Sequence, residues 1–208
     1  YSGLLWYGDS DVLGDTHFNM LHQQYGMLPW ECGYVSRLAE LVRWERQMLT
    51  QSGEGGSLAG TVSVPWLGEK TLRFLEQLAD ALRSIPQGYG KWHLFIDTSD
   101  SEEVKKNIRD RFSSLSNCLL KEPGGGYGSA LMRSKTAVIY GGYNSLMDVL
   151  YAGIPALVVE REMGDNEQQI HLQRLRKKMG DRYCVVSEAE VQSGQIVSFL
   201  LDNLSAGV

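Results

Sequence analysis

Short apolar runs alternate with longer amphipathic runs from Gly60 to the end of the chain. Each short run is long enough for a buried strand, and each longer run has room for a helix of several turns. This alternation is typical of repeated βα units, which build a parallel sheet with helices on both faces. We therefore predict an α/β fold with a doubly wound parallel sheet of about six strands.

The boundaries of these elements follow from the same pattern. The predicted strands lie at residues 59–64, 92–97, 117–120, 136–140, 155–159 and 182–186. The predicted helices lie at residues 68–84, 101–113, 127–133, 143–152, 166–179 and 188–203. In the first of these helices an apolar side chain recurs at every third or fourth position, which is the pattern of a helix lying on a sheet: Leu72, Leu75, Leu78 and Leu82.

The first sixty residues follow a different pattern. They predict a strand within residues 1–7, a short helix at 18–25 and a longer helix at 34–49. Glycine and serine at 52–57 predict a flexible turn before the alternating region. We expect residues 34–208 to form one domain, and residues 1–33 to be a lead-in segment or the tail of another domain.

Composition and charge exclude several classes of protein. Hydrophobic residues make up 43% of the 208 positions and charged residues 22%, which indicates a globular chain. The net charge of −5, with one short basic cluster at 174–178, argues against a nucleic-acid partner. No apolar run of about 18 residues is present to span a bilayer. The cysteines lack C-x-x-C spacing and are expected to be reduced, which favours the cytoplasm: Cys32, Cys118 and Cys184.

Motifs of several other enzyme classes are missing from the sequence. Neither the P-loop pattern G-x-x-x-x-G-K-[ST] nor the dinucleotide pattern G-x-G-x-x-G occurs. The hydrolase elbow G-x-S-x-G is also absent. The histidines are dispersed, and their spacing predicts no metal site: His17, His22, His93 and His171.

The residues after predicted strand 136–140 form the best candidate for a ligand site. Gly141 and Gly142 stand at the mouth of a helix, where a backbone without Cβ lets a ligand approach closely. We expect Asn144 or Ser145 to cap that helix. Free amides in the first turn and the positive end of the helix dipole would then suit a diphosphate.

A carboxylate and a second polar segment extend this candidate site. Asp148 lies one turn beyond Asn144, where it could accept hydrogen bonds from the two hydroxyls of a ribose. The polar stretch 161–169 follows the next predicted strand, at the same edge of the sheet. Taken singly, these features could be a βα turn, a solvated acid and a helix cap formed by Asp165 and Gln168. Together they fall where a parallel sheet holds its ligands, which favours a single pocket.

Residues 140–175 resemble the nucleotide-sugar-binding half of GT-B glycosyltransferases of the MurG-like group, glycosyltransferase family 28. The shared pattern runs G-G-x-N-[ST]-x-x-E-x-x-x-x-G-x-P, followed by a D-x-x-Q segment, and this chain has Asp148 in place of the glutamate. A looser similarity in element order covers residues 60–201, and residues 30–37 resemble the crossing between the two halves. The resemblance implies a Rossmann-like C-terminal domain and makes residues 1–33 the tail of a missing N-terminal Rossmann domain.

The same resemblance implies inverting transfer of a hexose from a UDP-type sugar donor to an unknown acceptor hydroxyl. Carried over by position, the donor-binding residues would be Gly141, Gly142, Asn144 and Ser145 for the diphosphate, Asp148 for the ribose, and Glu167 and Gln168 for the hexose. Such enzymes use no tightly held cofactor and, in this group, no essential metal. Their general base lies mainly in the N-terminal half, so this chain alone would bind without catalysing. Any membrane contact would be peripheral and through that half.

Two alternatives stay open on the sequence alone. The first is a UDP-sugar hydrolase or epimerase on the same scaffold. The second is a non-catalytic interaction module that has kept the fold and lost the site. Pro65 and Trp66 favour the second alternative, because they are bulky where the family has a glycine-rich loop after the first strand.

Overall fold

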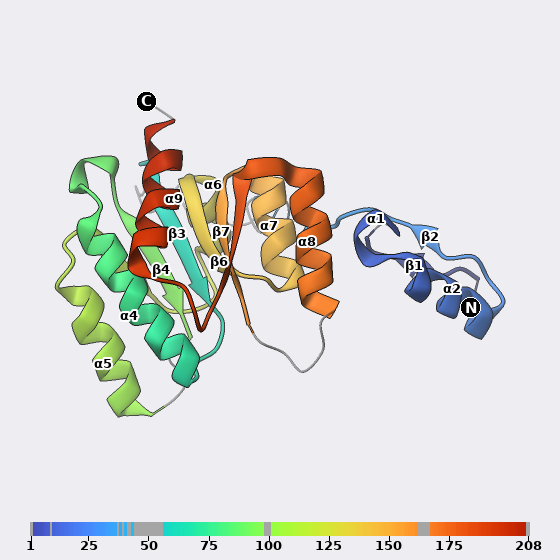
Figure 1. Ribbon diagram of the computed structural model, residues 1–208, viewed down its shortest axis with the longest axis horizontal. Helices are drawn as coiled ribbons and strands as arrows, with labels where there is room; N and C mark the ends of the chain where they lie inside the picture. The colour runs from blue at the N-terminus through green and yellow to red at the C-terminus, as the bar shows by residue number, and fades with distance from the viewer. Residues whose placement is uncertain are drawn as a thin grey trace.

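A computed structural model describes residues 2–8, 10–36, 38, 40, 43, 56–97, 101–161 and 167–206. Six parallel strands form the central sheet of this part of the chain (Figure 1). They are β3 (Leu58–Val64), β4 (Trp92–Ile96), β5 (Cys118–Lys121), β6 (Ser134–Tyr140), β7 (Ala156–Glu160) and β8 (Tyr183–Ser187). The predicted α/β class and parallel sheet are confirmed, and each predicted strand lies within two residues of the observed one.

The order of the strands defines where a ligand should bind. Across the sheet the order is β5-β4-β3-β6-β7-β8, which is the order 3-2-1-4-5-6 of a Rossmann sheet when β3 is counted as the first strand. The chain order therefore reverses between β3 and β6. In open α/β sheets the carboxyl ends of the two strands at such a reversal flank a ligand crevice.

Helices cover both faces of the sheet (Figure 1). One core layer contains side chains of α4 (Glu69–Ser84), α5 (Glu102–Ser113) and α9 (Ser193–Ser205). The other contains side chains of α6 (Tyr127–Met132), α7 (Tyr143–Ala152) and α8 (Glu167–Met179). Successive side chains of a strand point to opposite faces, so Val138 and Tyr140 enter the first layer while Ala137 and Ile139 enter the second. Short 3-10 turns, Gln87–Tyr89 and Gly180–Arg182, precede β4 and β8.

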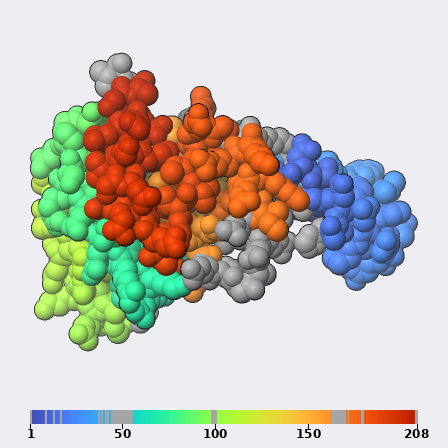
Figure 2. All heavy atoms as spheres, viewed as in Figure 1, coloured from blue at the N-terminus to red at the C-terminus, as the bar shows by residue number. Residues whose placement is uncertain are grey.

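The N-terminal residues form a small separate unit at one end of the molecule, beside α8 (Figure 2). It consists of β1 (Leu5–Trp6), α1 (Ser10–Leu13), α2 (Asp15–Tyr25) and β2 (Trp30–Glu31), with β1 and β2 paired in parallel. A hydrogen bond joins this unit to the main domain, because Arg174 Nη1 donates to the carbonyl of Val12 at 3.2 Å. The boundary expected between residues 33 and 34 stays a prediction.

Several element boundaries differ from the prediction. The strand expected within residues 1–7 is limited to Leu5–Trp6, since its pairing with β2 spans only two residues. The helix expected at 18–25 begins earlier, at Asp15, directly after Gly14. The helix expected at 188–203 begins later, at Ser193, because Gln192 and Gln195 form a capping box there. Of the helix expected at 34–49, residues 34–36 are not helical, residues 38, 40 and 43 are, and the rest lie outside the described residues.

Gly60, in the middle of β3, has a measurable role in the packing of the core. A Cβ built on it would lie 2.2 Å from the ring of Trp92, which is fully buried on the neighbouring strand. We therefore expect Gly60→Ala to lower the free energy of unfolding by about 1–3 kcal/mol through overpacking. Urea denaturation would measure this, and the double variant Gly60→Ala/Trp92→Leu should lose less than the two single changes summed.

Candidate functional site

The candidate site lies at the carboxyl ends of β3 and β6, the two strands at the reversal of strand order. After β6, the amide of Gly141 still donates to the carbonyl of Val159 on β7, at 3.0 Å. The sheet ladder therefore continues one residue past β6. The chain then leaves the sheet at Gly142 and enters α7 directly at Tyr143.

The N-terminus of α7 has the properties of an anion site. Gly142 is the N-cap, and no side chain of the described residues caps the helix. The first intrahelical hydrogen bond runs from the amide of Leu146 to the carbonyl of Gly142, at 3.0 Å. The amides of the three preceding residues, Tyr143 to Ser145, therefore have no acceptor within the helix. Together with the helix dipole, they form a site that favours a negatively charged group.

The expectation that Asn144 or Ser145 caps this helix is wrong. Gly142 adopts the extended N-cap conformation, so the helix begins immediately after the glycine pair. This places Asn144 and Ser145 at the second and third helical positions, with Asn144 exposed and Ser145 half-buried. Their amides take part in the anion site as backbone groups. At the other end of α7, Gly153 adopts the left-handed conformation and ends the helix.

Gly142 is not required by the backbone of this turn. Its φ of −71° and ψ of 146° are open to every residue type. A Cβ built on it would meet no atom of the described residues within 4 Å. The space beside the helix mouth is therefore open at Gly142, and the fold alone gives no reason for a glycine there.

Asp148 is buried, with 1% of its surface exposed. Its Oδ1 accepts a hydrogen bond from Ser36 Oγ at 2.8 Å, and Ser36 Oγ in turn accepts one from the amide of Leu38 at 2.9 Å. Asp148 thus joins α7 to the segment that leads out of the N-terminal unit. Nothing in the sequence indicated Ser36, because the two residues are 112 positions apart.

The second polar segment is described only in part. Asp165 and Asn166, and with them the expected capping box of Asp165 and Gln168, lie outside the described residues. Glu167 and Gln168 open α8, the helix that follows β7, and their side chains also lie outside the description. Glu167 and Gln168 therefore lie at the start of α8, and the strand before α8, β7, is the neighbour of β6 in the sheet.

A buried cluster of polar side chains lies at the carboxyl end of β6, on the face of the sheet that α4 covers. Glu188 Oε1 accepts hydrogen bonds from Thr71 Oγ1 at 2.6 Å and from the Tyr140 hydroxyl at 2.7 Å. The three side chains are at most 4% exposed. Burial, and then the hydrogen bond to Glu188, raise the pKa of Tyr140 above its ordinary value, so its hydroxyl stays a donor. The cluster joins the start of α4, the last residue of β6 and the turn after β8.

Aromatic side chains surround this cluster. The Trp66 ring meets the Tyr140 ring edge-on, with centroids 5.1 Å apart, and Phe74 meets Tyr140 at 5.9 Å. The guanidinium carbon of Arg161, just after β7, lies 5.3 Å from the centre of the Trp66 ring, within cation–π range. Trp66 packs against the core layer of α4, whereas α7 belongs to the opposite layer. Trp66 therefore lies on the face of the sheet that α4 covers.

The structure thus brings Gly141, Gly142, Asn144 and Ser145 together at one helix mouth and places Asp148 in the wall behind them. Sequence reasoning included Arg161 in the polar stretch 161–169 without giving it a role, and the structure places its positive charge just after β7, the neighbour of β6. Among the described residues, no three His, Cys, Asp or Glu side chains are grouped as metal ligands. No helix of the described chain is long and apolar enough to cross a membrane.

Comparison with known proteins identifies the fold. No protein-family model and no curated protein matches the sequence. Among solved structures, the glycotransferase of kitacinnamycin superposes with a TM-score of 0.53 over 97% of this chain and 67% of its own length, at 13% identity. MurG of Acinetobacter baumannii gives a TM-score of 0.56 over 86% of this chain and 50% of its own, at 12% identity.

A third similar structure is that of Arabidopsis thaliana UGT89C1 complexed with UDP-L-rhamnose. It gives a TM-score of 0.59 over 99% of this chain and 50% of its own length, at 13% identity. The chain therefore spans between half and two thirds of the length of these proteins. At such low identity the superpositions show a shared fold, the Rossmann-like α/β fold found in glycosyltransferases.

Proposed function

We propose that this chain is the donor-binding domain of a glycosyltransferase and that it binds a UDP-sugar at the mouth of α7. The observation that carries the proposal is the open N-terminus of α7 at the reversal of strand order, with an N-cap glycine that the backbone does not need. A ligand that must approach the main chain closely gives a reason for that glycine. The fold shared with structures of glycosyltransferases, one of them complexed with UDP-L-rhamnose, supports the same function.

The diphosphate would rest on the amides of Tyr143 to Ser145, with Gly141 and Gly142 leaving room for it. Arg161 stands after β7, beside β6, and its charge would add to the attraction of the helix N-terminus for the phosphates. The guanidinium of Arg161 lies over the ring of Trp66. In this proposal the tryptophan positions a phosphate-binding cation.

The sugar contacts of the donor complete the proposal. Asp148 would accept hydrogen bonds from the ribose hydroxyls, and because its Oδ1 already holds Ser36, the donor would exchange with that serine. Glu167 and Gln168, at the start of α8, would meet the hexose. An acceptor hydroxyl would attack the anomeric carbon on the face opposite the diphosphate, so that the new C–O bond forms as the bond to the diphosphate breaks and UDP leaves, with inversion. The proton of the hydroxyl would go to a base outside the donor-binding domain.

The N-terminal unit supports the proposal that a second Rossmann domain completes the enzyme. Parallel sheets are normally buried on both faces, and two strands alone are marginally stable. Here β1 and β2 form a parallel pair of two residues each, and Trp30 on β2 is 70% exposed. Other exposed apolar side chains of this unit are Leu5, Tyr7, Met20, Tyr25 and Leu28. We propose that these residues belong to a larger parallel sheet, which would supply the acceptor site.

Titration calorimetry with UDP tests the donor site directly. We expect Gly142→Ala to weaken UDP binding by about tenfold or more, because the new Cβ would occupy the space of the diphosphate and displace its hydrogen bonds. The melting temperature should not change, since the added methyl meets open space. Gly88→Ala is the matched control: its Cβ also meets nothing within 4 Å, and it lies just before β4 at the opposite edge of the sheet.

Three results would contradict the proposal. The first is no heat and no thermal shift with millimolar UDP or UDP-hexoses. The second is UDP binding that Gly142→Ala leaves unchanged, which would place the nucleotide elsewhere. The third concerns the reaction: if a complete enzyme released free sugar from UDP-sugar without any acceptor, the protein would be a hydrolase.

A further inference from the structure

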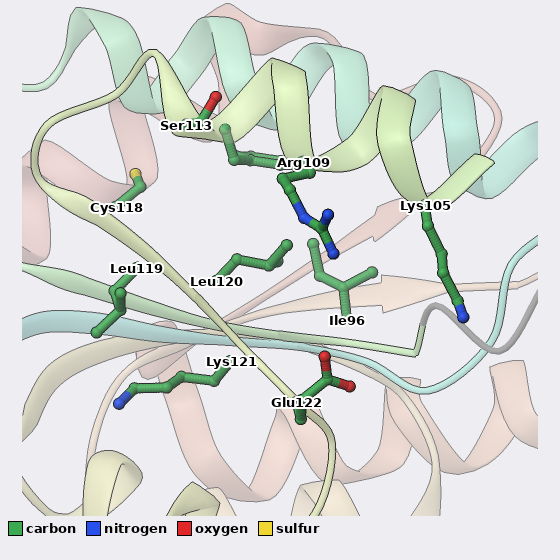
Figure 3. A pocket seen from close by; sticks show the side chains of 10 residues that line it. Ile96, Lys105, Arg109, Ser113, Cys118, Leu119, Leu120, Lys121 and Glu122 are labelled. Carbon is green, nitrogen blue, oxygen red and sulfur yellow. The ribbon is translucent and has the colours of Figure 1, made fainter. Parts of the chain in front are cut away.

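A second hollow lies at the other side of the sheet, between α5 and the edge strand β5 (Figure 3). Its volume is about 390 Å³, within the range of pockets that bind small molecules. It is lined by α5, β5 and the end of β4, whereas the mouth of α7 follows β6. Three strand spacings between β5 and β6 correspond to about 14 Å. The hollow therefore lies apart from the mouth of α7, where the phosphate site is proposed.

The floor of the hollow is apolar. Ile96, at the end of β4, and Phe112, on α5, are almost fully buried, and Leu120 of β5 packs against the same core. Cys118 also lines the hollow. Burial raises the pKa of its thiol to about 12, so the thiol is uncharged. Such a floor suits the hydrocarbon part of a ligand.

The walls of the hollow carry charged groups. Lys105 and Arg109 come from α5, and Lys121 and Glu122 from the end of β5 and the residue after it. Figure 3 shows the side chains of Lys105 and Arg109 reaching from α5 toward the strands, while the Glu122 carboxylate points up from the opposite side. The Lys121 side chain points away from the other three (Figure 3), and Lys105 pairs with Glu102, so Arg109 is the cation that the hollow itself presents, opposite the Glu122 carboxylate.

Arg109 is the better candidate of the two helix cations for holding an anion. Lys105 is held by Glu102, whose Oε1 lies 2.9 Å from its Nζ. A guanidinium presents two parallel N–H groups that match a carboxylate or phosphate. In the described part of the chain, β5 pairs with β4 alone, so it is an edge strand of the sheet.

We propose that this hollow binds a small organic anion, with its carboxylate or phosphate on Arg109 and its hydrocarbon part on the floor of Ile96, Phe112 and Leu120. The preference for an anion follows from the Arg109 guanidinium, which reaches from α5 toward the strands, and the preference for an apolar body follows from the floor. The test distinguishes a carboxylate from a phosphate by using one ligand of each kind.

The experiment is a nitrogen–proton NMR titration of the whole chain with hexanoate, hexyl phosphate, inorganic phosphate and hexylammonium. We expect hexanoate or hexyl phosphate to shift the amides of Arg109 and of residues 118–122, with little change at Tyr143 to Ser145. Inorganic phosphate should bind more weakly because it lacks the apolar body. Hexylammonium should not bind, because the cations would repel it.

Arg109→Gln should weaken binding of the better anion by about tenfold, since a charge-assisted hydrogen bond is lost. Lys106→Gln is the matched control, because Lys106 is exposed on the same helix but does not line the hollow. The melting temperatures of both variants should stay near that of the parent protein.

Four results would overturn the proposal. They are no shifts at millimolar ligand, equal binding of inorganic phosphate and hexyl phosphate, an equal loss in Lys106→Gln, and shifts confined to the mouth of α7. If an extended acidic peptide shifted the amide signals of β5 and neither hexyl ligand did, the ligand of this hollow would be a peptide and not a small anion.

Discussion

Glu188→Ala is expected to lower the free energy of unfolding by about 2–5 kcal/mol, because it leaves two buried hydroxyls without their acceptor. Thr71 and Tyr140 both donate to Glu188 Oε1, and all three side chains are at most 4% exposed. Each unsatisfied buried group costs about 1–3 kcal/mol. The lost packing of the glutamate side chain adds to this cost. Urea denaturation followed by circular dichroism would measure the change.

Variants of the two donors separate hydrogen bonding from packing. Tyr140→Phe and Thr71→Val each remove one donor and should cost about 1–3 kcal/mol. The triple variant Thr71→Val/Tyr140→Phe/Glu188→Leu removes donors and acceptor together, so it should be more stable than Glu188→Ala. If the triple variant were the least stable of the set, packing would dominate over hydrogen bonding. If Glu188→Ala cost under about 0.5 kcal/mol, water would be reaching the cluster.

The sheet could be predicted because its signal is local. The four inner strands, β3, β4, β6 and β7, are buried along nearly their whole length, so each reads as a short continuous apolar run. The helices of the main domain keep one apolar stripe each, which α4 shows most clearly. Neither signal depends on residues far away in the sequence.

The start of α7 was misjudged because two residues nearby offered equally good caps. Asn144 and Ser145 are both strong N-cap residues, and local preference alone favours either over glycine. The structure begins the helix at Tyr143, since the sheet ladder holds Gly141 to Val159 and leaves Gly142 as the only residue between strand and helix. The constraint comes from β7, which a local reading of the sequence does not include.

The polar contacts of the site could not be predicted because they join distant parts of the chain. Ser36 and Asp148 are 112 residues apart, and Thr71 and Glu188 are 117 apart. Each pair meets only after the sheet has assembled. Arg161 was given no role for a similar reason, since its contact with Trp66 joins residues that follow two different strands.

Asp148→Ala is expected to weaken UDP binding by about 5- to 150-fold, the range that follows from losing a hydrogen-bonded contact worth about 1–3 kcal/mol. It should also lower the free energy of unfolding by about 1–3 kcal/mol, because the hydroxyl of Ser36 loses its buried acceptor. Calorimetry measures the first effect and urea denaturation the second.

Ser36→Ala distinguishes the two roles of Asp148, as it removes the serine contact and keeps the carboxylate. If the ribose takes the place of Ser36, this variant loses stability but binds UDP at least as tightly as the parent protein, since the donor no longer competes with the serine. The loss of binding affinity caused by Asp148→Ala should also be smaller with 2′-deoxy-UDP than with UDP, because one of the two ribose hydroxyls is then missing. Equal losses of UDP affinity in both variants, with no dependence on the 2′-hydroxyl, would show that Asp148 acts on the nucleotide only by holding the segment of Ser36 in place.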